Sequence, residues 1–496
     1  MRPRRRAPRL LPLVLLLLAG SALHAHPARA TATKGFVLTT DYVTGTLSVL
    51  DLATRSVTAD VAVVSPDAFA RWYDGLLYVV NRLGYDNVQV VDPANGYATV
   101  RQFSVGSGTN PQDIAFASPS KAYVSRLGSP DLLVVDPGTG TATGTVSLAA
   151  WADADGNPEA ARMAVVGDLL FVALERLTNF VPADTGLVVV VDMRADTVYD
   201  ADPSAAGMQV VRLPGMNPST GFARLDGAGP GAATRLFIGC VGRWGELDGG
   251  IAEIVVPGWA QGGATLRAGT PAAITCPGYA ITEAALGGDV AAVVAYDAEH
   301  CYAVVSDASF NTSLVAWDPE AGARLGTLYA PGGYSLADVA LNDRGELWAC
   351  NSSFEAPGLR AWSVGGDEPL AGPIATGLPP VQIVFDQADR PLPGVGAASP
   401  GGLALAAPAP NPARGDVRLA VTSALAGEVE VGVFDATGRR VRALTSGTRV
   451  AGTTLLAWDR RDTAGRRVRP GVYLVRARLG GVTASRRLVV LDGGSP

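Results

Sequence analysis

The chain has 496 residues, of which 48% are hydrophobic and 17% charged, and its formal net charge is −6. Residues 31–403 carry 19 basic and 39 acidic side chains, whereas residues 404–496 carry 15 basic and 7 acidic ones. The acidic first part argues against nucleic acid as a partner, because phosphate would be repelled. This size and the two charge regimes predict a large domain followed by a small one.

Residues 1–30 have the parts of a secretory signal peptide. Arginines crowd the start, an apolar run extends from Leu10 to Ala19, and Ala28-Arg29-Ala30 is a small-x-small cleavage site. The apolar run is shorter than the about 20 residues that span a bilayer, and no later segment is apolar enough to do so. We therefore expect an exported protein without a transmembrane segment, located in the periplasm, in the medium or at the cell surface.

From residue 31 to residue 390 one kind of unit recurs. Its most regular strand reads, in chain order, GFVLTTD (35–41), LLYVVN (76–81), KAYVSR (121–126), LLFVALE (169–175), RLFIGC (235–240), HCYAVVSD (300–307) and ELWACN (346–351). Each copy is followed by a polar loop and a second β-branched run, several of which end in Asp-Pro and a glycine turn. Alternating apolar residues and regular turn signals indicate strands. Four strands every ~45–60 residues predict the blades of a β-propeller.

The number of strands predicts how the ring closes. The first unit lacks a preceding strand, and residues 380–386 (PVQIVFD) supply a spare one at the far end. We therefore expect a seven-bladed β-propeller in which this last strand closes blade one and removes two exposed edges. The repeat resembles that of YVTN-type seven-bladed propellers, most closely in the second and third units.

A Pro/Gly/Ala linker at residues 391–409 separates the propeller from residues 410–492, which alternate like a small Ig-like β-sandwich. PNPARG, VFDATGRRV, AWDRRDTAG and PGVYLVRA resemble the immunoglobulin-like domain of flagellar hook-capping proteins and of type IX secretion sorting modules. Those sorting modules usually end in a Lys-rich strand, whereas this chain ends in the Arg-rich RRLVVL. Two interpretations stay open: a sorting or attachment module, and a structural cap.

Catalytic machinery is not apparent in the sequence. His300 is the one histidine after residue 30, no GxSxG motif exists, and Cys301 would point to the opposite face of the strand. Cys240, Cys276, Cys301 and Cys350 have no zinc-ribbon or haem spacing, and their disulfide pairing is left open. We assign no catalytic residue.

Arginines recur in the loops after the second strand of four consecutive units: Arg82, Arg126, Arg176 and Arg243. The blade-opening strands carry acids at a matching place: Asp67, Asp113, Glu159, Asp289 and Asp338. One interpretation pairs each arginine with a neighbouring acid and pins adjacent blades together; Arg82 with Asp67 and Arg126 with Asp113 are the candidate pairs. The other leaves the arginines, with Trp244 of the same loops, to hold a ligand.

The segment Asp153-Ala-Asp155-Gly-Asn157-Pro-Glu159 places oxygen-bearing side chains at alternate positions. Calcium prefers such ligands, so calcium is the one cofactor that the sequence suggests; the alternative is an Asx-rich turn. As a whole, the sequence predicts a non-enzymatic binding or scaffold protein for an unidentified protein, peptide or glycan. The alternative is an extracellular hydrolase or lyase that uses carboxylates, with or without calcium, at the channel mouth.

Overall fold

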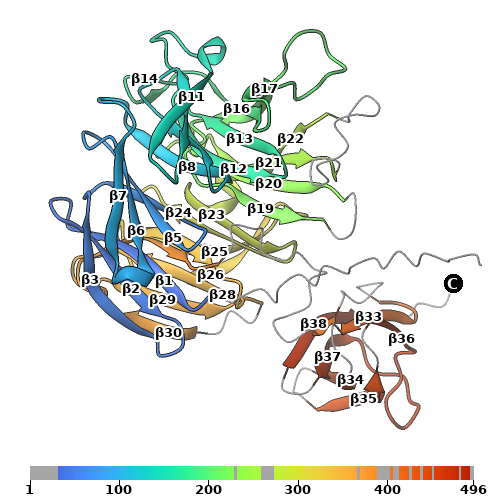
Figure 1. Cartoon of the computed structure of the whole chain (residues 1–496). Coiled ribbons are helices and arrows are strands. Elements are labelled where there is room, and N and C mark those ends of the chain that lie inside the picture. Colours follow the sequence, from blue (N-terminus) through green and yellow to red (C-terminus); the bar gives the residue numbers. More distant parts are fainter. Residues whose placement is uncertain are drawn as a thin grey trace, which may run out of the picture. The chain divides into compact units, whose positions relative to one another are not determined.

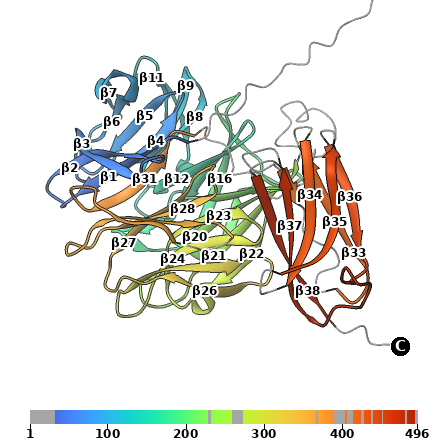
Figure 2. The same ribbon diagram turned by 90° about the horizontal axis from the view of Figure 1, so that it is seen from below.

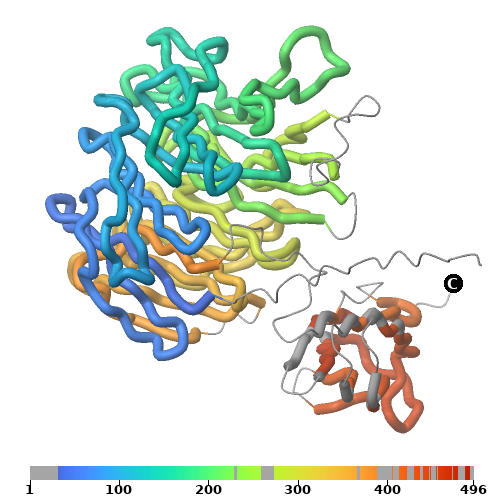
Figure 3. The backbone as a smooth tube through the Cα atoms, viewed as in Figure 1, coloured from blue at the N-terminus to red at the C-terminus, as the bar shows by residue number. Residues whose placement is uncertain are grey.

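The structure is a computed structural model that describes residues 32–227, 232–258, 273–365, 369–387, 403–405, 413–423, 427–435, 439–449, 452–479 and 482–491; Figure 3 draws the other residues in grey. The signal peptide expected at residues 1–30 therefore lies outside the described residues, as does most of the expected linker. Within the described residues, no helix is long and apolar enough to cross a membrane.

The described strands between residues 34 and 385 form seven sheets of four or five strands (Figure 1). From the innermost strand outward, the first three sheets are β31 (Pro380–Phe385), β1 (Lys34–Thr40), β2 (Gly45–Asp51), β3 (Ser56–Val64); β4 (Ala68–Tyr73), β5 (Leu76–Asn81), β6 (Asn87–Asp92), β7 (Ala98–Ser104); and β8 (Pro111–Ser118), β9 (Lys121–Arg126), β10 (Asp131–Asp136), β11 (Thr141–Ser147).

The fourth sheet has an outer edge shared by two strands: β12 (Ala160–Val166), β13 (Leu169–Leu174), β16 (Thr185–Asp192), and then β17 (Thr197–Tyr199) and β18 (Val211–Met216). The last three sheets are β19 (Ala223–Asp226), β20 (Thr234–Cys240), β21 (Gly250–Val256), β22 (Thr275–Thr282); β23 (Asp289–Asp297), β24 (His300–Ser306), β25 (Thr312–Asp318), β26 (Ala323–Tyr329); and β27 (Leu336–Leu341), β28 (Glu346–Asn351), β29 (Gly358–Ser363), β30 (Pro369–Ile374). Short elements fill the connections: η1 (Pro93–Asn95), η2 (Ala149–Trp151), the β14 (Leu177–Thr178) and β15 (Val181–Pro182) hairpin, and α1 (Glu283–Leu286).

The two ends of this region meet in one sheet. β31 pairs antiparallel with β1, with Gly35 opposite Phe385 and Val37 opposite Ile383. The Asp386 carboxylate then accepts the backbone N–H groups of Thr33 at 2.6 Å and Lys34 at 2.9 Å. Because two edges are paired here, neither is left open to other chains.

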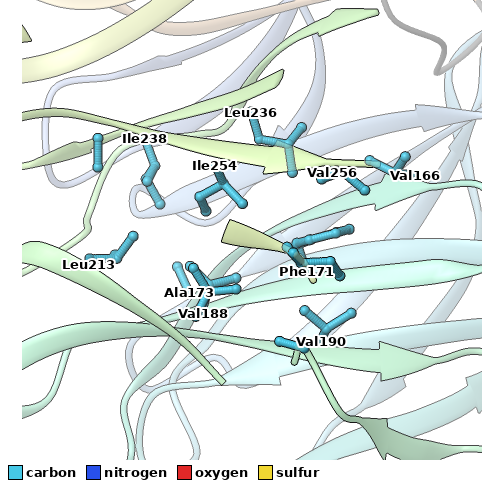
Figure 4. Packing of buried hydrophobic residues seen from close by; sticks show 14 of the residues in the cluster. Val166, Phe171, Ala173, Val188, Val190, Leu213, Leu236, Ile238, Ile254 and Val256 are labelled. Atoms are coloured by element: carbon cyan, nitrogen blue, oxygen red, sulfur yellow. The ribbon is translucent and has the colours of Figure 1, made fainter. Parts of the chain in front are cut away.

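The innermost strands follow one another around the ring. β31 lies beside β4, β4 beside β8, β8 beside β12, β19 beside β23, β23 beside β27, and β27 beside β31. Arg224 of β19 supplies a link to β12, since its Nη1 donates to the Val165 carbonyl at 2.7 Å. Apolar side chains fill the space between neighbouring sheets, as Figure 4 shows for Phe171 and Val188 of one sheet against Leu236 and Ile254 of the next.

The C-terminal unit consists of two antiparallel sheets (Figure 2). One contains β32 (Leu403–Leu405), β33 (Val417–Ser423) and β36 (Gly452–Trp458); the other contains β35 (Arg440–Arg449), β34 (Gly427–Asp435), β37 (Gly471–Leu479) and β38 (Val482–Val490). Buried Leu405, Val431, Trp458 and Val475 belong to one core. The all-β fold class predicted from the sequence, a β-propeller followed by a small sandwich, is confirmed. The unit includes β32, which the sequence analysis had placed in the linker.

Candidate functional site

One face of the propeller carries a series of exposed aromatic residues. They occupy the loops between the second and third strands, counted outward, of six of the seven described sheets: Tyr42, Tyr85, Phe180, Trp244, Phe310 and Phe354, here called the aromatic rim. Their exposed fractions run from 44% for Trp244 to 76% for Phe180. Because every sheet repeats the same order of antiparallel strands, these loops leave the ring on the same face.

The backbone of the rim is unusual for such residues. Tyr42, Phe180 and Phe310 have φ angles of 69°, 62° and 59°, and bulky side chains rarely adopt this left-handed region. The Trp244 ring also meets Tyr334, which lies on the connection from β26 to β27, edge-on at 6.5 Å between ring centroids. Side chains that would gain free energy by burial are thus held in solvent by constrained loops, which is typical of a binding surface.

A group of polar side chains lies where the innermost strands approach the same face. It comprises Arg82, Gln112, Arg162 and Glu175, here called the central cluster. Arg82 Nη1 donates to the Gln112 side-chain oxygen at 3.1 Å, and Arg162 Nη1 donates to the Gln112 backbone carbonyl at 2.6 Å. The Arg162 guanidinium also stacks on the Phe69 ring, with 3.8 Å to its centroid. Two guanidinium groups are therefore fixed on either side of one glutamine.

The electrostatics of the central cluster favour an anion. Burial, and then repulsion from Arg82, lowers the pKa of Arg162 to about 10. Burial raises the pKa of Glu175 to about 7, although both arginines oppose the shift. Arg162 forms no ion pair with any described residue. Near neutral pH the cluster thus holds a guanidinium that Asp113 and Glu175 attract without a direct ion pair, beside a carboxyl group of Glu175 that is only partly ionised.

The arginine that pairs with Asp113 and joins adjacent blades is Arg71 of β4. The sequence analysis had predicted Arg126 as this partner. Arg71 Nε and Nη2 donate to both oxygens of the fully buried Asp113 at 2.9 and 2.8 Å, from one blade to the next. Asp113 also accepts the Met163 backbone N–H of a third blade at 2.9 Å. This bidentate pair joins three successive innermost strands.

The four predicted arginines bind mostly within their own blades. The exceptions are the Arg82 bond to Gln112 and the Arg126 bond to Val105, which lies on the connection from β7 to β8. Arg82 pairs with Asp67, as expected. The expected Arg126–Asp113 pair is wrong: Arg126 bends back to the carbonyls of Val105 and Asp131, both at 3.1 Å. Arg176 pairs with Asp184 of its own loop at 2.7 Å, and the exposed Arg243 lies 3.6 Å from Glu246.

Adjacent blades are joined instead by other ion pairs, which the loop pattern did not reveal. They are Arg71–Asp113, Arg55–Glu346, Lys121–Asp196 and Arg235–Glu320. The predicted loop arginines therefore stabilise hairpins, and Arg82 alone among them belongs to the central cluster.

Three of the four predicted calcium ligands converge. Oxygens of Asp153, Asp155 and Glu159 lie within 4.8 Å of one another. Asn157 donates its backbone N–H to Asp155 at 2.9 Å, and Leu177 N–H binds Glu159 at 2.9 Å. Burial, with repulsion from the two aspartates, raises the pKa of Glu159 to about 8. The donor set suits a hard cation, and the Asx turns of the alternative interpretation are also present.

The surroundings of His300 and of the four cysteines indicate structural roles and not catalytic ones. His300 Nδ1 lies 2.7 Å from Asp297 Oδ1 at the turn between β23 and β24. Cys240, Cys276, Cys301 and Cys350 are all free thiols, and burial raises the pKa of each one. A thiol that resists ionisation is a poor nucleophile.

Comparison with known proteins identifies the fold of the C-terminal unit. Residues 409–480 match the family model of the FlgD Ig-like domain, which shows an Ig-like fold for the C-terminal unit. No curated protein sequence matches the chain.

Among solved structures, a protein from Lactobacillus plantarum is 16% identical over 71% of this chain and 99% of its own, with a TM-score of 0.49. The β-propeller domain of Myceliophteria thermophila Cps50 (Swd1) is 15% identical over 68% and 98%, with a TM-score of 0.45. PorZ, a surface component of the type-IX secretion system of Porphyromonas gingivalis, is 17% identical over 90% of this chain, with a TM-score of 0.40; the match spans 63% of the length of PorZ.

Proposed function

We propose that this protein is an exported, non-enzymatic binding or scaffold protein whose partner docks on the aromatic rim and places an acidic group at the central cluster. The rim is the observation that carries the proposal. Six blades each expose a large aromatic side chain on the same face, and such side chains stack on sugar rings or bury apolar groups of a peptide.

The central cluster supplies the second element of recognition. Arg162 is oriented by Phe69 and Gln112, so little side-chain entropy is lost when it binds a carboxylate or a similar anion. The partner that fits both elements is a glycan or a peptide segment that places a single acidic group at the central cluster, because the acidic propeller would repel a polyanion. The loop of Asp153, Asp155 and Glu159 would hold calcium beside this face, since Thr178 of the Phe180 loop donates to Asp153 at 3.0 Å.

The Ig-like domain acts in this proposal as the module that sorts or attaches the protein at the cell surface, and its match to the FlgD Ig-like domain supports a role in assembly at or outside the envelope. We also infer that the propeller repeats are of the YVTN type, on the strength of LLYVVN and KAYVSR in the second and third sheets. The predicted signal peptide supports export.

Binding to arrays of acidic and neutral oligosaccharides and acidic peptides tests the proposal. A variant with Tyr85→Ser, Phe180→Ser and Phe354→Ser removes half of the rim. A matched control with Val63→Ser, Val100→Ser and Leu325→Ser changes exposed apolar residues of the outer strands β3, β7 and β26. We expect the rim variant to lose the ligand that the wild type selects and the control to keep it. Equal binding by all three proteins would refute the proposal.

A further inference from the structure

A groove opens on the outer face of the β34, β35 and β37 sheet of the Ig-like domain. Its volume is about 330 Å³, and it is lined by Glu430, Gly432, Phe434, Arg440, Arg476 and Arg478. On β34 the lining residues Glu430, Gly432 and Phe434 alternate with the buried Val429, Val431 and Val433. The lining residues must therefore face away from the core. A volume of this size suits a small ligand.

Gly432 lies in the floor of the groove, closely covered by its neighbours. A Cβ at this position would lie 3.2 Å from the Phe434 ring, 3.3 Å from the Arg442 carbonyl oxygen and 3.5 Å from Arg440 Cδ. The backbone of Gly432 has no left-handed φ that would require glycine. Glycine weakens a strand interior and often marks a place where a ligand approaches the backbone closely. The missing side chain therefore lets the Phe434 ring and the Arg440 stem lie close to the β34 backbone, where both line the groove.

Of the three arginines that line the groove, Arg440 pairs with the one glutamate, and Arg476 and Arg478 are available to bind a ligand. Arg440 Nη1 donates to Glu430 at 2.7 Å. The Arg476 guanidinium lies 4.9 Å above the Phe434 ring, which holds it in place without neutralising it. Arg478 stands opposite Glu430 in the strand register, but that carboxylate is occupied by Arg440. Within the described part of the chain, neither Arg476 nor Arg478 forms an ion pair.

We propose that this groove binds a phosphate monoester, with Arg476 and Arg478 as the anion-binding residues and Phe434 as the floor beneath the attached group. Three arginines and one glutamate give the lining a formal charge of two positive units, which matches a dianion. Two guanidinium forks can each donate two hydrogen bonds to phosphate oxygens. Either a soluble sugar phosphate or a phosphate headgroup at a lipid surface supplies this chemistry.

Calorimetric titration of the full chain with glucose 6-phosphate and with inorganic phosphate tests the assignment. We expect the double variant Arg476→Gln/Arg478→Gln to weaken sugar-phosphate binding by about tenfold or more, since both forks are lost. Gly432→Ala, which keeps every charge, should weaken binding of the sugar phosphate more than that of inorganic phosphate, because the added methyl group would crowd the Phe434 ring beneath the sugar. The control Arg418→Gln/Arg466→Gln removes two exposed arginines elsewhere on the same domain and should bind like the wild type.

Vesicles of equal parts phosphatidylcholine and phosphatidic acid separate the two sources of phosphate. Vesicle binding that depends on Arg476 and Arg478, with weak binding of the free sugar phosphate, assigns the groove to a lipid headgroup; the reverse assigns it to a soluble ligand. Equal losses in the groove variant and the control would mean diffuse charge attraction and overturn the proposal, as would no binding of any probe. Melting curves of each variant verify its fold, and Gly432→Ala remains decisive if the arginine variants unfold.

Discussion

Replacing Arg71 by alanine should destabilise the propeller more than replacing Arg82. Arg71→Ala removes both hydrogen bonds to Asp113, whose side chain is 0% exposed, while that of Arg71 is 30% exposed. Leaving a buried carboxylate without its partner costs about 3–5 kcal/mol. We expect Arg71→Ala to lose about 3 kcal/mol of unfolding free energy, because the backbone N–H groups of Met163 and Ile114 still bind Asp113 and solvent screens the partly exposed Arg71.

Arg82→Ala serves as the comparison within the same blade. Its partner Asp67 is 43% exposed and Arg82 itself 24% exposed, so the ion pair should contribute about 0.2–1 kcal/mol, as for surface pairs. Loss of the hydrogen bond to Gln112 should add about 1 kcal/mol. Urea unfolding followed by far-UV circular dichroism measures both free energies of unfolding. A double-mutant cycle with Asp113→Asn isolates the Arg71–Asp113 term. Equal losses for Arg71→Ala and Arg82→Ala, or no coupling in the cycle, would refute the assignment of Arg71 as the residue that joins the blades.

Three further perturbations have defined outcomes. Glu175 has a pKa of about 7, so it is mostly neutral below that pH, and the affinity for an acidic ligand should rise as pH falls from 8 to 6. Glu175→Gln should weaken this dependence, while Asp338, whose pKa burial also raises to about 7 near Arg162, supplies the remainder; the same pH profile in both proteins would contradict the role of Glu175. Calcium should raise the melting temperature of the wild type but not that of the double variant Asp153→Asn/Asp155→Asn. An equal shift in both proteins would show that these residues do not bind calcium. Deleting residues 380–387 removes β31 and its bonds to β1, so the propeller should lose its cooperative unfolding transition; a truncated protein that melts like the full one would show that the closure is dispensable.

The strand pattern was sufficient to predict the fold class, because alternation and turn signals are local properties of the sequence. The same reasoning identified Arg82 with Asp67, which flank the adjoining strands β5 and β4 of one blade. It failed for Arg71 with Asp113, 42 residues apart, because such a partner is determined by how neighbouring blades approach each other around the ring. Arg162 went unnoticed for the same reason: its strand reads as an ordinary blade strand, and only the ring brings it to Gln112. β32 was missed because three residues between alanines and prolines carry no periodicity.

Binding of the array-selected ligand to Arg162→Gln tests the central claim most directly, because this arginine is the proposed acidic-group site of the central cluster and has no ion pair of its own among the described residues. Glutamine keeps an amide donor for the Gln112 carbonyl, and Arg418→Gln controls for the change in net charge. We expect Arg162→Gln to fold normally and to bind an acidic ligand at least about tenfold more weakly, with neutral analogues unaffected. Full affinity for the acidic ligand in the folded Arg162→Gln variant would contradict the proposed function.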